Sequence, residues 1–154
     1  MTHSRPKKRF TLLKHETEDD VHVDFLLENE QETLWTWRIN DVEFFSQPAE
    51  NRSISAVRIF DHRKLYLDFE GELSGSRGRV MQIDTGTWQF VRQNKNRLVI
   101  ETDSHLFSGT WSFLFPENPE NHVGTDVPAD VGFPESDLGV WTLVWNRLSR
   151  RHAG

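Results

Sequence analysis

The segment from residue 15 to residue 24 carries side chains of the types that can bind a metal ion. His22 and Asp24 are two positions apart in an apolar run, and His15 ends the run before it. Side chains two apart on a β-strand lie on the same face, so an imidazole and a carboxylate would be neighbours. Such donors suit Mn²⁺, Fe²⁺ or Zn²⁺, and His15 would complete a three-ligand set. The alternative is that His22 and Asp24 face solvent beside a solvated acidic turn, Glu16 to Asp20.

These side chains must be positioned by β-strands, because short runs of β-branched and aromatic residues recur and helical periodicity is scarce. So many short strands predict an all-β fold, a small closed or partly closed antiparallel β-barrel with few or no helices. Turn residues are predicted at Asp84-Thr85-Gly86 and Gln93-Asn94-Lys95-Asn96. The predicted strands are Arg9–Lys14, Val21–Glu28, Thr33–Ile39, Ile54–Phe60, Tyr66–Leu73, Arg79–Ile83, Gly86–Arg92, Arg97–Thr102, Gly109–Phe115 and Val140–Trp145.

Composition narrows the classes of function. The chain has 154 residues and six tryptophans, which favours one globular domain. It has no cysteine, which excludes disulfides, thiolate metal sites and cysteine nucleophiles. A net charge of -6 provides no overall basic field, so any phosphate must be bound locally. No apolar run is long enough to span a membrane, and we expect a cytoplasmic protein without a membrane partner.

A longer series of motifs lies between residues 61 and 88. Asp61-His62, Tyr66, and Asp68-Phe69-Glu70-Gly71 are followed by Gly75, Gly78 and Ile83-Asp84-Thr85-Gly86-Thr87-Trp88. With Arg9-Phe10, His15 and Val21–Glu28 before them, these residues resemble the 3'-phosphoesterase domain of bacterial DNA ligase D and its stand-alone relatives. The resemblance covers roughly residues 9 to 115.

The resemblance implies a β-barrel that uses a divalent metal, typically manganese, to remove 3'-terminal phosphates and ribonucleotides from DNA ends during repair. His15, His22 and Asp24 would hold the metal, and His62 and Tyr66 would contact the phosphate or support the transition state. The implied partners are a nucleic-acid 3' end or another phosphate ester, and a DNA ligase or end-joining protein.

The chain departs from the family pattern at phosphate-binding positions. Leu26 and Ile54 stand where the family has arginines, and the turn between the first two histidines is one residue longer. We expect Arg58, which has the strand parity of His62, and Arg9, which matches a family position, to supply the missing cations. The alternative function is a metal- or nucleic-acid-binding module of the same fold with weakened catalysis.

Four segments are predicted from these patterns. Residues 1–8 form a basic tail, and residues 9–115 form the phosphoesterase-like barrel. Residues 116–139 are a loop or lid rich in proline and glycine, and residues 140–154 add a C-terminal strand and a basic tail.

Overall fold

A computed structural model describes residues 7–94, 97–115 and 139–147 of the chain. They form mainly β-strands, with a four-residue α-helix and one turn of 3-10 helix. In chain order the elements are β1 (Lys8–Glu16), β2 (Val21–Glu28), β3 (Thr33–Ile39), α1 (Glu43–Ser46), β4 (Ser53–Arg63), η1 (Lys64–Leu67), β5 (Gly71–Glu72), β6 (Arg79–Gln93), β7 (Arg97–Ser104), β8 (Gly109–Leu114) and β9 (Gly139–Asn146).

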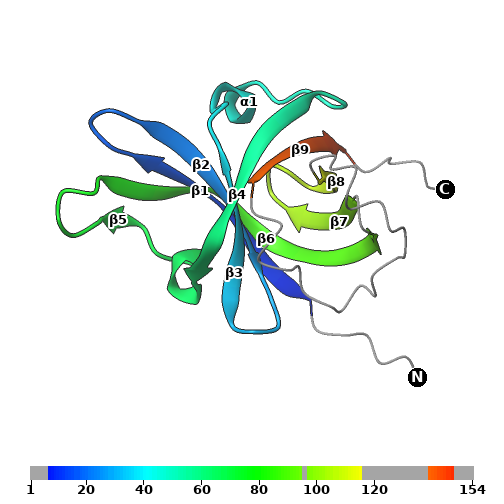
Figure 1. Cartoon of the computed structure of the whole chain (residues 1–154), viewed down its shortest axis with the longest axis horizontal. Coiled ribbons are helices and arrows are strands. Elements are labelled where there is room, and N and C mark those ends of the chain that lie inside the picture. Colours follow the sequence, from blue (N-terminus) through cyan, green and yellow to red (C-terminus); the bar gives the residue numbers. More distant parts are fainter. Residues whose placement is uncertain (1–6, 95–96, 116–138, 148–154) are drawn as a thin grey trace.

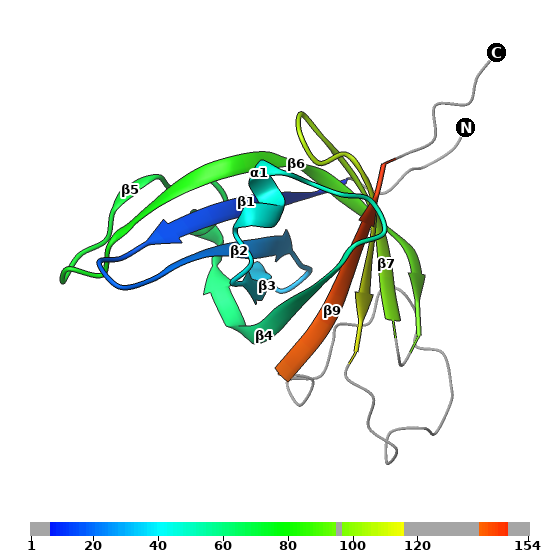
Figure 2. The same ribbon diagram turned by 90° about the horizontal axis from the view of Figure 1, so that it is seen from above.

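Eight of the described strands close into an antiparallel barrel. Their order is β1-β2-β3-β4-β9-β8-β7-β6, and a β1–β6 pairing joins the two ends. The short β5 pairs with the beginning of β6. Both views show the β1–β2 hairpin and the β5–β6 segment extending together from one side of the barrel, away from β7 (Figures 1 and 2). The predicted all-β barrel is therefore confirmed.

Large aromatic rings fill the barrel. Inward positions alternate along the strands with outward ones, as in Val23, Phe25 and Leu27 of β2, all fully buried. Trp35 and Trp37 point inward together from β3, because side chains two apart on a strand share a face. The other buried tryptophans of this interior are Trp88, Trp111, Trp141 and Trp145.

The predicted turn at Asp84-Thr85-Gly86 is wrong, because β6 runs unbroken from Arg79 to Gln93. Asp84 is buried, and its carboxylate accepts hydrogen bonds from the Ser104 hydroxyl at 2.6 Å and the Phe107 amide at 2.9 Å. At Gly86 an added Cβ would lie 2.0 Å from the Asp103 carbonyl oxygen. Asp84 therefore binds the β7–β8 turn, and Gly86 allows β7 to pack closely on β6. Aspartate and glycine are also common in turns, which is why a turn was predicted here.

The predicted strand Tyr66–Leu73 is also wrong. Its first residues form η1, and only Gly71 and Glu72 are extended. The carbonyl of Leu67 accepts hydrogen bonds from the Thr11 hydroxyl at 2.9 Å and from the Gln82 side-chain amide at 2.6 Å. These contacts hold η1 against the outer wall of the barrel, where Leu67 packs on Leu13, Leu26, Leu34 and Val80. We call these five residues the outer cluster.

The barrel includes β9, which the sequence analysis placed outside it. The predicted strand Val140–Trp145 exists, and it pairs with both β4 and β8. Without it the edges of β4 and β8 would be unpaired. The predicted tail at residues 1–8 and the predicted loop at 116–139 fall largely outside the described residues, as do Lys95, Asn96 and the residues after 147. The helices described are all too short to cross a membrane.

Candidate metal and phosphate site

Polar side chains converge on the outer face of β1 to β4, beside η1. His15 and His22 are direct cross-strand partners in the β1–β2 pairing. Asp24 follows on the same face of β2 and pairs with Arg38 of β3. His62, near the end of β4, brings its Nε2 to 3.4 Å from Asp24 Oδ2. The structure therefore brings four predicted site residues together.

Hydrogen bonds orient the two facing imidazoles. His15 Nε2 donates to the Arg77 carbonyl oxygen at 2.7 Å, because a carbonyl can only accept. His22 Nδ1 likewise donates to the Asp20 carboxylate at 2.9 Å. In the neutral rings the lone pairs of His15 Nδ1 and His22 Nε2 then face each other at 3.2 Å. This arrangement is stabilised by a cation between them, either a proton or a metal ion.

Asp24 is the buried acceptor at the centre of the group. Its Oδ1 lies 3.6 Å from His22 Nε2 and 3.4 Å from Arg38 Nε. Burial raises the pKa of Asp24, but hydrogen bonding and charge from His22, in its protonated form, and from His62 outweigh burial and hold the pKa of Asp24 well below its usual range. Burial lowers the pKa of His22, yet its hydrogen bonds to Asp24 and Asp20 leave it above its ordinary value. Asp24 therefore stays ionised at neutral pH.

The donor set suits a divalent ion, although its side chains are not fully arranged for one. Two imidazole nitrogens and a carboxylate suit first-row divalent metals, and bonds of about 2.1 Å place neighbouring donors about 3.0 to 3.4 Å apart. The separation of His15 Nδ1 and His22 Nε2, 3.2 Å, matches that value. As they stand, no three such side chains within residues 7–94, 97–115 and 139–147 form a metal site. Asp24 instead divides its oxygens between Arg38 and His62.

His62 and Tyr66 lie together at the η1 side of the cluster. Their rings meet edge to face, with centroids 5.8 Å apart. His62 Nδ1 faces the Phe60 carbonyl at 3.3 Å while Nε2 faces Asp24, so each nitrogen points at an oxygen acceptor. The Tyr66 side chain is half-buried and packs on Phe69 of the same turn. These two residues can thus present an imidazole and a phenol to one ligand.

Arg58 does not join this group, and the expectation that it shares a face with His62 is wrong. Thr36 pairs with Ile59 and Leu34 pairs with His62, so β4 has one extra residue between these pairs. This bulge reverses the parity, and Arg58 points into the barrel, 4% exposed. Its guanidinium lies 5.3 Å from the Trp37 ring and 5.9 Å from the Trp141 ring.

Arg9 lies on the outer face but is already engaged. Its two terminal nitrogens donate to the two carboxylate oxygens of Asp68, at 2.9 and 2.7 Å. One of them also lies 3.3 Å from the Thr85 hydroxyl. The hydrogen bond to Asp68 raises the pKa of Arg9 above its ordinary value, more than burial lowers it. A phosphate would have to displace Asp68 before Arg9 could bind it.

Leu26 and Ile54, which stand where the family has arginines, pack among apolar side chains. Leu26 is fully buried in the outer cluster beneath Leu67. Ile54 points into the barrel among its aromatic rings. The longer turn after His15 is closed by hydrogen bonds between Thr17 and Asp20, and it leaves His15 opposite His22. The extra residue therefore does not remove His15 from the site.

Two residues of the site were not predicted from the sequence. Asp20 orients His22, and Arg38 contacts Asp24. Asp20 precedes His22 by two positions, which is the same spacing that identified Asp24. Arg38 carries no local signal, because only the β2–β3 register places it beside Asp24.

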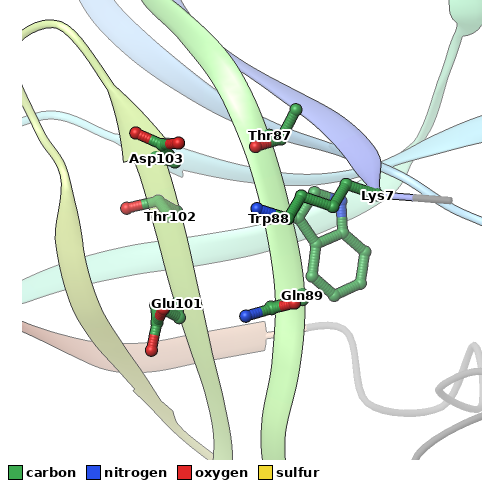
Figure 3. Close-up of a pocket in the computed structure, with 7 residues that line it drawn as sticks. All are labelled: Lys7, Thr87, Trp88, Gln89, Glu101, Thr102 and Asp103. Carbon is green, nitrogen blue, oxygen red and sulfur yellow. The ribbon is translucent and has the colours of Figure 1, made fainter. Parts of the chain in front are cut away.

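Two hollows lie outside this group. One, of about 10 Å³, is formed by Lys7 and by facing residues of β6 and β7, and it has room for about one water molecule (Figure 3). The other, of about 890 Å³, is open and lies between the turns after β1 and β5, and its lining has four acidic residues, Glu16, Glu18, Asp19 and Glu72, against one basic residue, Arg79. Its acidic character disfavours a nucleic-acid backbone there.

The fold and the site define the class of the protein: a closed β-barrel with a histidine and carboxylate group on its outer wall. The family model of the DNA ligase D 3'-phosphoesterase domain matches residues 13–116, about two thirds of the chain. The chain belongs to that family, and the match contains His15, His22, Asp24, His62 and Tyr66. No curated protein matches the chain.

Proposed function

We propose that this protein is a divalent-metal-dependent phosphoesterase that removes a phosphate or a ribonucleotide from nucleic-acid 3' ends. The observation that carries the proposal is the convergence of His15, His22, Asp24 and His62 on one barrel face. The family match supports the same activity, because it contains these four residues. Ends freed in this way are substrates for a DNA ligase or an end-joining protein, which we propose as the functional partner.

His15 Nδ1, His22 Nε2 and Asp24 Oδ1 would hold the metal, most simply Mn²⁺. The Arg77 carbonyl and Asp20 keep the other imidazole nitrogens protonated, so both free lone pairs face the same point. A modest rotation of Asp24 that moves Oδ1 toward the two imidazole nitrogens and Oδ2 away from His62 would complete the three ligands. When bound, the ion supplies positive charge that polarises a phosphoryl oxygen and lowers the pKa of a water molecule.

His62 and Tyr66 would act on the phosphate itself. With Asp24 engaged by the metal, His62 Nε2 is freed to donate a hydrogen bond to a phosphoryl oxygen. The Tyr66 ring meets the His62 ring edge to face, and its hydroxyl would add a neutral donor. Both donors stabilise charge that develops on the phosphoryl oxygens in the transition state.

The proposal is tested by incubating a labelled primer-template that ends in a 3'-phosphate or a 3'-ribonucleotide, with and without Mn²⁺. We expect Mn²⁺-dependent loss of the 3' group by the wild type. We expect the rate to fall about 100-fold or more in His22→Ala, because the metal loses an imidazole. His105→Ala, at an exposed histidine outside the site, is the matched control and should keep the wild-type rate.

A wild type that binds Mn²⁺ yet releases neither 3' group would contradict the proposal. It would favour the second candidate, a metal- or nucleic-acid-binding module with weakened catalysis. The observation behind that candidate is the replacement of two family arginines by Leu26 and Ile54, both buried among apolar side chains.

A further inference from the structure

Arg38 presents an unused guanidinium edge at the site. Its Nε lies 3.4 Å from Asp24 Oδ1, which anchors the side chain. Within the described part of the chain, its two terminal nitrogens have no hydrogen-bond partner, and the side chain is 38% exposed. A planar guanidinium fixed at one edge and open at the other can bind two oxygens of one phosphate.

The charges around the site require such a cation. A divalent ion held by Asp24 keeps one net positive charge, and the carboxylate of Asp20 behind His22 offsets it. A terminal phosphate carries up to two negative charges, so it needs further positive charge beside the metal. Arg38 acts on these same groups, since its charge helps to lower the pKa of Asp20 and opposes the rise in the pKa of His22.

Arg58 and Arg9, the cations predicted from the sequence, are poorly placed for this role, and so is Lys64 of η1. Arg58 is inside the barrel, and the terminal nitrogens of Arg9 are held by Asp68. Lys64 of η1 is paired with Glu28 at 3.0 Å. Arg38 combines an open edge with direct contact to a predicted metal ligand.

We propose that Arg38 binds the terminal phosphate of the substrate and takes over the role of the arginine that Leu26 replaces. This inference rests on the proposed function, because it assigns a substrate contact within the same site. It places the phosphate between His62 and Arg38, which approach opposite oxygens of Asp24.

The test measures binding without turnover. Two labelled DNA oligonucleotides of one sequence end either in a non-hydrolysable 3'-phosphonate or in a 3'-hydroxyl, and their dissociation constants are measured with Mn²⁺ present. The wild type should prefer the phosphonate end. Arg38→Ala should lose about tenfold or more of that preference, because a charge-assisted pair of hydrogen bonds is removed. Arg38→Lys, which keeps the charge without the planar edge, should lie between them.

The matched control is Arg92→Ala, an exposed arginine on β6 outside the site. It removes the same charge, so it should weaken both oligonucleotides alike and leave the preference unchanged. Titration of Mn²⁺ into each variant separates two roles for Arg38. A phosphate contact predicts Mn²⁺ affinity at or above that of the wild type, whereas a role in positioning Asp24 predicts weaker Mn²⁺ binding.

A phosphonate preference that survives in Arg38→Ala, a wild type without that preference, or a loss that parallels weaker Mn²⁺ binding would each overturn the inference. The cleavage assay distinguishes failure of this inference from failure of the proposed function. Turnover by the wild type with an unchanged preference in Arg38→Ala rejects the role of Arg38 and keeps the proposed function. A preference that depends on Arg38 without turnover keeps the phosphate site and rejects the hydrolysis.

Discussion

Asp24 is the central residue of the site, because its carboxylate contacts two histidines and one arginine. His22 lies two residues before it, while Arg38 and His62 reach it from β3 and β4. Each contact supplies a donor to a carboxylate that is 3% exposed. A buried carboxylate with these partners is stabilised in its ionised form.

The metal-free protein should show this coupling as a pH-dependent stability. The lowered pKa of Asp24 stabilises the fold above its unfolded pKa of about 4, and this contribution is lost as the pH falls through the folded pKa. The raised pKa of His22 stabilises the fold below about pH 6.5, and this contribution is lost as the pH rises through the folded pKa.

We therefore expect the stability that Asp24 contributes to be larger at about pH 5.5 than at about pH 8. It is measured as the difference in free energy of unfolding between the wild type and Asp24→Asn, by urea denaturation in EDTA. Asp103→Asn, at an exposed aspartate of β7, is the control and should show little difference at either pH. An Asp24→Asn difference that is the same at both pH values would refute the coupling.

For individual residues, the sequence predicted which side chains share a face of one strand. It missed contacts between side chains on different strands. The two-residue spacing of His22 and Asp24 was enough to place both side chains on one face of β2. The same parity argument failed for Arg58, because a single extra residue in β4 reverses the alternation and leaves no mark in the sequence. Arg38 was missed because its partner is set by register.

Among the elements, the turn between β5 and β6 has a direct role in the site. Its Arg77 carbonyl accepts the hydrogen bond that fixes the His15 ring. The turn packs closely on the end of β1, since a Cβ added at Gly78 would lie 2.0 Å from the Glu16 carbonyl oxygen. Gly78 also has a φ of 86°, which favours glycine.

We expect Gly78→Ala to push the turn away from β1 and release His15 from the Arg77 carbonyl. Mn²⁺ affinity, measured by calorimetric titration, should fall about tenfold or more, as for other lost contacts behind a metal ligand. Gly75→Ala is a matched control in the same turn, because Gly75 also has a positive φ but nothing lies within 4 Å of its Cβ position. Equal losses in the two variants would show that backbone strain, rather than the position of His15, controls metal binding.

The bounds of strands were predicted correctly for apolar runs that are buried in the barrel wall, and a short apolar run that forms a 3-10 turn was wrongly predicted as a strand. Val21–Glu28 and Thr33–Ile39 have the bounds that their apolar patterns predict. The alternation after Tyr66 instead belongs to η1, whose Leu67 packs on the outer cluster. No pattern local to those residues shows that a second apolar cluster lies outside the barrel wall.

For the whole molecule, the barrel depends on a strand that the family match does not reach. The match ends at residue 116, whereas β9 fills the gap between β4 and β8. Trp141 and Leu143 of β9 are fully buried in the interior, while Val140 is 57% exposed. The sequence patterns predicted a barrel that ends at residue 115, yet β9 belongs to the same core.

We expect Trp141→Ala to lower the free energy of unfolding by about 3 to 5 kcal/mol, since it removes a large ring from the core. Val140→Ala, on the neighbouring outward position, should change it by about 0.5 kcal/mol or less. Urea denaturation of both variants measures the contrast. Similar small effects would show that β9 is peripheral to the stability of the barrel.

The place of β9 in the ring also sets the order of events during folding. Ser53 of β4 pairs with Val144, and the other seam joins β1 to β6, so both closures link residues far apart in the chain. Closing such long loops costs conformational entropy before the favourable contacts form. Topologies of this kind fold in milliseconds to seconds. On the ribosome, the edges of β4 and β8 stay open to other strands until residue 146 has emerged. Chaperones that shield strand edges would therefore act on this chain until β9 has been synthesised.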